Sequence, residues 1–68
     1  MFVLEWLKDG RTIQSEPVLA ANLDDVLRDI RADAVRISST LGATPDTVRI
    51  KDFQRGKITI HELKASDD

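Results

Sequence analysis

One apolar stripe with helical spacing constrains the fold of this chain most strongly. Seven apolar residues recur on one face of an α-helix when the chain is wound at 3.6 residues per turn; they are Leu23, Val26, Leu27, Ile30, Ala34, Ile37 and Leu41. Asn22 precedes the stripe and can cap the first turn. Gly42 follows it, where a residue in the left-handed conformation commonly ends a helix. The pattern therefore predicts a helix over residues 23–41 with a single apolar side.

The segment before the helix has the pattern of a β-hairpin. Residues 2–8 are rich in apolar and aromatic side chains, and Asp9-Gly10 follows. Asp-Gly favours a two-residue turn because both turn positions need positive φ. This turn predicts cross-strand pairs such as Trp6 with Ile13, Glu5 with Gln14 and Leu4 with Ser15. The expected inward residues are Phe2, Leu4, Trp6 and Ile13, and the expected outward residues are Val3, Glu5, Leu7, Thr12, Gln14 and Glu16. The second strand is polar and contains a proline, which is typical of a sheet edge.

A second hairpin is predicted after the helix. Residues 47–53 and 57–63 alternate in polarity, and Gln54-Arg55-Gly56 separates them. A three-residue loop would set Ile50 opposite Ile60, whereas a slip of one residue would expose isoleucine side chains to solvent. The expected inward residues are Val48, Ile50, Ile58 and Ile60. The expected outward residues are Thr47, Arg49, Lys51, Phe53, Lys57, Thr59, His61 and Leu63.

These elements predict a two-layer α+β fold of β-β-α-β-β order, with a single helix packed on a four-stranded, mainly antiparallel sheet. Residues 1–64 form one domain in this interpretation, and residues 65–68 form a disordered tail. The first strand is expected at the centre of the sheet because it is the most apolar. The strand order 2-1-3-4 meets these conditions, and the order 2-1-4-3 remains open.

Composition excludes several classes of function. The 68 residues include no cysteine, which excludes disulfides and thiolate chemistry. The formal net charge of −2 lacks the basic excess of a dedicated nucleic-acid binder. No apolar run approaches the roughly 20 residues of a membrane span, and the start of the chain does not resemble a signal peptide. We therefore expect a cytoplasmic domain with no membrane association, in an architecture common among small bacterial proteins.

No residue pattern indicates a catalytic or metal site. His61 is the single histidine, and the expected pairing brings no carboxylate beside it. Asp25, Asp29 and Asp33 share one side of the predicted helix, but arginines lie among them, which is typical of a solvated helix surface with ion pairs. The glycines form no phosphate-binding loop. Trp6 fits a core position under the helix better than an anchor at an interface. The sequence thus predicts a non-enzyme without cofactor or metal.

A single helix can cover only one face of the sheet, and the uncovered face is the candidate working surface. Its predicted partner-binding residues are Val3, Leu7, Arg49, Lys51, Phe53, Lys57 and His61. Besides an ordinary solvated face, two functions fit it. The first is contact with protein, either a second copy in a homodimer or another protein. The alternative is a nucleic-acid-binding module that uses the basic strands 47–53 and 57–63.

Overall fold

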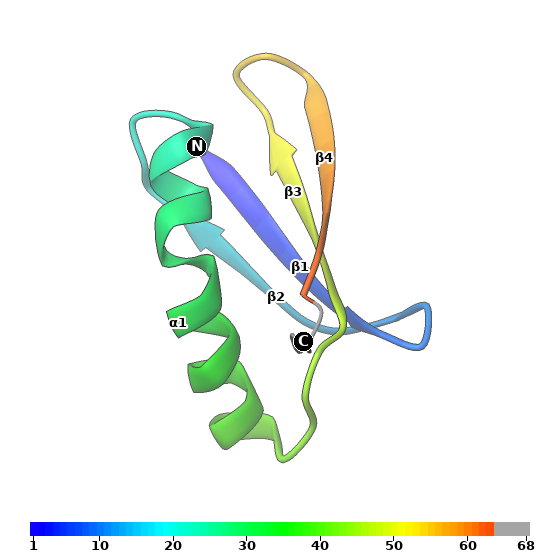
Figure 1. Ribbon diagram of the computed structural model, residues 1–68. Coiled ribbons are helices and arrows are strands. Elements are labelled where there is room, and N and C mark those ends of the chain that lie inside the picture. The colour runs from blue at the N-terminus through cyan, green and yellow to red at the C-terminus, as the bar shows by residue number, and fades with distance from the viewer. Residues whose placement is uncertain (64–68) are drawn as a thin grey trace.

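The computed structural model describes residues 1–63 and confirms the predicted α+β architecture (Figure 1). The elements are β1 (Phe2–Lys8), β2 (Arg11–Val18), α1 (Leu23–Leu41), β3 (Thr47–Asp52) and β4 (Lys57–Glu62). The strands form one antiparallel sheet in the order β2-β1-β3-β4, which is the first of the two predicted orders. The predicted tail, 65–68, lies outside the described residues.

Helix α1 begins and ends where the sequence predicts, and both ends are capped. The Asn22 side chain accepts a hydrogen bond of 3.0 Å from the backbone N–H of Asp25. Gly42 adopts the left-handed conformation, with φ of 69°, and its N–H donates to the Ser38 carbonyl at 2.9 Å. The two caps thus fix the length of the helix that covers the sheet.

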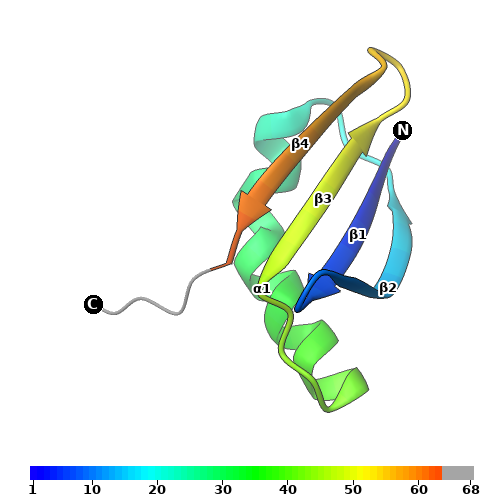
Figure 2. The ribbon, with the colours of Figure 1, turned by 90° about the vertical axis from the view of Figure 1, so that its right-hand side faces the viewer.

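The core lies between α1 and one face of the sheet, and the opposite face is uncovered (Figure 2). Strands β1 and β3 bury every second residue toward the helix. The buried apolar residues are Phe2, Leu4, Trp6, Val26, Ile30, Ile37, Val48 and Ile50. Among the described residues, all eight come from β1, α1 and β3, so the outer strands contribute only to the periphery of the core.

The first hairpin has the predicted turn, but a β-bulge changes its register. Asp9 and Gly10 have φ of 52° and 79°, as a type I′ turn requires. The register then shifts between Leu7 and Trp6, so that Trp6 pairs with Gln14 rather than with Ile13. The predicted partners of Trp6, Glu5 and Leu4 are therefore wrong by one residue, because Ile13 is an extra residue in β2.

The bulge turns Gln14 and Glu16 toward the helix side, where the sequence analysis did not place them. Glu16 pairs with Leu4, and its Oε2 accepts hydrogen bonds from Trp6 Nε1 at 3.2 Å and from Arg36 Nη2 at 2.8 Å. The hydrogen bond to Glu16 raises the pKa of Arg36. The carboxylate therefore links β2, the core tryptophan and the helix.

The second hairpin also differs from the prediction, because its loop has four residues, 53–56. Asp52 pairs with Lys57, Lys51 with Ile58 and Arg49 with Ile60. The predicted pairing of Ile50 with Ile60 is wrong, and both Ile58 and Ile60 lie on the uncovered face instead of in the core. Conversely, the residues of β4 and its end that were expected to face outward lie on the helix side; they are Lys57, Thr59, His61 and Leu63.

Strands β1 and β3 are joined by hydrogen bonds beyond both ends of their ladder. At one end, the N–H of Asp46 donates to the Leu7 carbonyl at 2.9 Å, and Asp46 Oδ2 accepts from the N–H of Asp9 at 3.0 Å. The hydrogen bond from Asp9 is the main reason that the pKa of Asp46 lies below its ordinary value. At the other end, the N–H of Phe53 donates to the Met1 carbonyl at 3.4 Å. The connection between α1 and β3 is thereby attached to the turn of the first hairpin.

Candidate protein-interaction surface

The face of the sheet that α1 leaves uncovered, called the open face here, consists of three rows of side chains that cross the strands from β2 to β4. Because residues paired across antiparallel strands share a face, the register defines the rows. They are Pro17, Val3, Lys51 and Ile58; Ser15, Glu5, Arg49 and Ile60; and Thr12, Leu7, Thr47 and Glu62. Within residues 1–63, these three rows hold two cationic and two acidic side chains, so their formal charge is zero.

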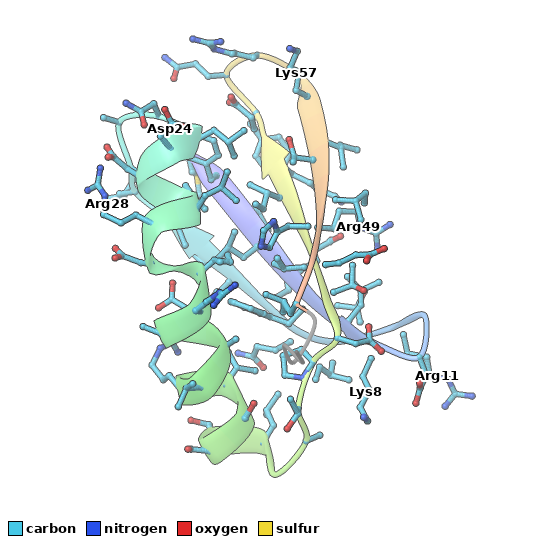
Figure 3. The ribbon with its side chains drawn as sticks, viewed as in Figure 1. Lys8, Arg11, Asp24, Arg28, Arg49 and Lys57 are labelled. Atoms are coloured by element: carbon cyan, nitrogen blue, oxygen red, sulfur yellow. The ribbon has the colours of Figure 1, made fainter. Side chains whose placement is uncertain are left out.

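An ion-paired cluster lies at the centre of the open face. Glu5 Oε1 accepts a hydrogen bond of 2.7 Å from Arg49 Nε, and Glu5 Oε2 lies 3.1 Å from Lys51 Nζ. Figure 3 shows Arg49 pointing away from α1. The hydrogen bond from Lys51, and then the one from Arg49, lowers the pKa of Glu5, while desolvation acts in the opposite direction. The carboxylate thus holds both cations in place at the middle of the sheet.

Beside this cluster, β4 presents the isoleucine pair, Ile58 and Ile60. Each side chain is 60% exposed, although isoleucine is among the residues most often buried in proteins. Both lie on the open face of an edge strand and flank the long side chains of Lys51 and Arg49. The open face therefore has an ion-paired centre, with two cations on one carboxylate, and an apolar margin along β4.

The structure brings together four of the seven predicted partner-binding residues: Val3, Leu7, Arg49 and Lys51 share the open face. Phe53 lies in the β3–β4 loop and is 64% exposed. Lys57 and His61 pair with Asp52 and Val48 and lie on the helix side, so their assignment to the open face is wrong. Sequence reasoning missed Ile58 and Ile60, because their alternation with polar residues shows that they share a face but not which face is covered.

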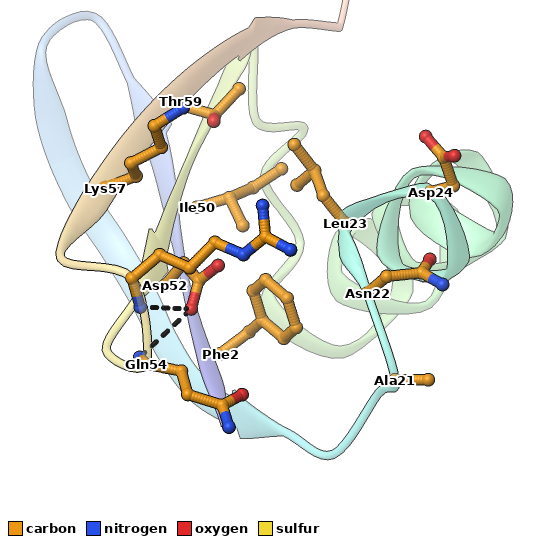
Figure 4. Close-up of a pocket in the computed structure, with 11 residues that line it drawn as sticks. Phe2, Ala21, Asn22, Leu23, Asp24, Ile50, Asp52, Gln54, Lys57 and Thr59 are labelled. Carbon is orange, nitrogen blue, oxygen red and sulfur yellow. Dashed lines mark hydrogen bonds between the residues drawn. The ribbon is translucent and has the colours of Figure 1, made fainter.

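A hollow of about 370 Å³ lies on the helix side, between the start of α1 and the β3–β4 loop (Figure 4). Phe2, Leu23 and Ile50 contribute its apolar part, and Asp52 and Lys57 lie at its margin. Its charged lining has both signs, so it does not select a cation or an anion. Within residues 1–63, no three His, Asp or Glu side chains come together as ligands for a metal ion.

The ion-paired cluster predicts how stability depends on pH. Since the pKa of Glu5 is lower in the folded state than in the unfolded chain, its contribution is present above the unfolded value, roughly 4.3, and is lost as the pH falls through the folded value. We expect the free energy of unfolding to decline below about pH 4.5, with a shallower decline in Glu5→Gln. Urea titrations between pH 3 and pH 7 measure both slopes. Equal slopes in the two proteins would contradict the role of Glu5.

Fold and surface together define a small two-layer α+β domain with one open sheet face. Comparison with protein families, with curated proteins and with solved structures finds no match to this chain. Over the described part of the chain, no helix combines the length and the apolarity that crossing a membrane requires.

Proposed function

We propose that this chain is a non-catalytic domain that works by protein contact through its open face, and that its partner is a second copy. The observation that carries the proposal is the exposure of the isoleucine pair: Ile58 and Ile60 are each 60% exposed, side by side on an uncovered sheet. Contiguous exposed apolar surface of this kind marks interaction sites more often than isolated exposed residues do.

The energetics of a small domain support self-association. A chain of about 60–70 residues buries only roughly 60% of the surface that it exposes when unfolded, so its stability margin is thin. Burial of further apolar surface contributes about 25 cal/mol per Å². The zero formal charge of the open face removes net electrostatic repulsion between two copies. Covering the isoleucine pair with its own counterpart is therefore favourable.

Nucleic-acid binding receives less support from the geometry. Arg49 and Lys51 are both engaged by Glu5, and a third proposed cation, Lys57, lies on the helix side. A phosphate would have to compete with the Glu5 carboxylate for the two remaining cations. This function would show as binding that weakens steeply with salt and that is lost in Arg49→Glu or Lys51→Glu.

Sedimentation equilibrium between 10 µM and 1 mM tests the proposal. We expect the mass to rise from that of a monomer to that of a dimer over this range, and Ile60→Asp to remain a monomer because it places a carboxylate in the contact. Val35→Asp is the matched control, since Val35 is 67% exposed on the helix, away from the open face. A monomeric mass at 1 mM, or a dimer that survives Ile60→Asp, would contradict the proposal.

A further inference from the structure

The two edges of the sheet differ in how far they resist pairing with another strand. The β2 edge carries the bulge at Ile13 and also Pro17, which has no N–H to donate. Bulges and prolines are common means by which proteins protect an edge. Strand β4 has neither: it pairs residue by residue with β3 from Lys57 to Glu62. The β4 edge is therefore the one that can accept a further strand.

The hydrogen-bond pattern shows which backbone groups this edge presents. The N–H of Leu63 donates to the Asp46 carbonyl at 2.9 Å, which continues the β3–β4 ladder by one pair. Bonded and non-bonded pairs alternate in an antiparallel ladder. Thr59 and His61 therefore direct their backbone groups to β3, and Ile58 and Ile60 direct theirs to the open edge.

We propose that β4 pairs antiparallel with β4 of a second copy, with Thr59 opposite Thr59, so that two four-stranded sheets become one eight-stranded sheet. This inference rests on the self-association in the proposed function, and it places the contact at the β4 edge, beside the isoleucine pair, instead of across the whole open face. The two-fold axis would run perpendicular to the sheet through the Thr59 pair, which keeps both helices on the same side.

The side-chain pattern of β4 favours this register. With Thr59 at the centre, Ile58 lies opposite Ile60 of the second copy on both sides of the axis, so four isoleucines adjoin on the open face. With Ile60 at the centre, Ile58 would instead lie opposite Glu62, which sets an apolar side chain against a carboxylate. The first register brings apolar side chains into contact with each other and leaves the carboxylate at the rim.

The charges permit the same register. On the open face, Lys51 is separated from Arg49 of the second copy by three strand spacings, roughly 14 Å, which exceeds the Debye length of about 8 Å at physiological ionic strength. On the helix side, Lys57 lies opposite His61 of the second copy, and its cross-strand neighbour in its own chain is Asp52. On that side the two copies thus approach through the Thr59 pair at the axis and through a lysine and an imidazole on either side of it.

The proposed β4–β4 contact is small, and it joins only two copies. An interface of one strand pair belongs to the class below about 1,200 Å², which is typical of weak and transient association. We therefore expect a dissociation constant in the micromolar range or weaker. Because Pro17 and the bulge protect the β2 edge, the association ends at the dimer instead of growing into a filament.

A single cysteine tests the pairing directly, since the chain contains none. Opposed residues of a non-bonded antiparallel pair have Cα atoms about 4.5 Å apart, which lies within the range of a disulfide. We expect Thr59→Cys at 200 µM to form a disulfide-linked dimer under mild oxidation, at least tenfold faster than Thr12→Cys. Thr12 is also a threonine on an edge strand, but it lies on β2 and is exposed, whereas Thr59 is half-buried. Non-reducing electrophoresis over time gives both rates.

Amide hydrogen exchange of the unmodified protein provides the second measurement. Raising the concentration from 20 µM to 1 mM should slow exchange at Ile58 and Ile60 several-fold and leave Thr59 unchanged, because Thr59 is already bonded to β3. A dimer with no such slowing, and with equal cross-linking of both cysteine variants, overturns the edge pairing but leaves the proposed function intact. Faster cross-linking of Ile60→Cys than of Thr59→Cys overturns the register. A strictly monomeric protein overturns the function and the pairing together.

Discussion

Trp6→Ala is expected to cost about 3–5 kcal/mol of folding free energy, the range for removing a large buried aromatic side chain. Trp6 is fully buried at the centre of β1, and its indole N–H donates to Glu16 at 3.2 Å. For a chain of this length the whole free energy of unfolding is roughly 3–10 kcal/mol. The substitution therefore removes a large part of the stability, and we expect a partly unfolded population at 37 °C.

Circular dichroism in a urea titration measures this loss without relying on tryptophan fluorescence. Trp6→Phe is the matched control, because it keeps most of the apolar volume and removes the hydrogen bond to Glu16. Arg36 still binds that carboxylate in the control, so its cost should be about 1–2 kcal/mol. If Trp6→Ala cost no more than Trp6→Phe, the volume of the indole ring would not be what stabilises the core.

Ile30→Ala is the second large effect, at about 2–5 kcal/mol. Ile30 is 2% exposed in the middle of α1, where its side chain packs against the sheet. Truncation leaves a cavity that the surrounding β1 and β3 side chains can fill only in part, since both strands are fixed by neighbours in the sheet. The cost therefore includes both the lost burial and the empty volume.

Val35→Ala separates packing from helix propensity in this test. Val35 lies on the same helix, is also β-branched and is 67% exposed. Alanine favours the helix at both positions, so the control should be neutral or slightly stabilising. Thermal and urea unfolding of the two variants give the difference. A loss of under 1 kcal/mol for Ile30→Ala would mean that Ile30 does not occupy the centre of the core.

Local signals in the sequence were sufficient to predict the helix and the first turn. The spacing from Leu23 to Leu41, with Asn22 and Gly42 at its ends, predicts the helix with the bounds observed. Asp9-Gly10 predicts the first turn because few other dipeptides adopt positive φ twice. These features are determined within a few residues of chain, so no knowledge of the tertiary structure was needed.

The bulge in β2 could not be predicted, because a turn fixes the register only until a residue is inserted. Gln14 and Glu16 lie on the helix side although neither is apolar. Glu16 is stabilised there because Arg36, twenty positions further along the chain, donates to it at 2.8 Å. That compensation exists only in three dimensions, so polarity alone assigned both residues to the wrong face.

The predicted register of β4 is wrong for a different reason. Isoleucines on a strand are expected to face the core, but β4 is an edge strand, and β1, β3 and α1 already fill the core. The aspartate at position 52 is a local signal for the four-residue loop. In the structure, Asp52 Oδ1 accepts hydrogen bonds from the N–H groups of Gln54 at 3.0 Å and Arg55 at 3.2 Å. An aspartate at the start of a turn commonly bonds the backbone two and three residues later. The candidate site therefore changed in composition while the open face itself was predicted correctly.

The hydrogen bonds beyond both ends of the β1–β3 ladder have a consequence for how the domain comes apart. The two hairpins are separated in sequence by the helix, yet Asp46 attaches the second to the turn of the first, and Phe53 attaches its far end to Met1. Neither hairpin can melt while the other persists without breaking these attachments and exposing Trp6. Unfolding should consequently be an all-or-none process for the whole chain, in which fluorescence of Trp6 and ellipticity of the helix follow one and the same transition.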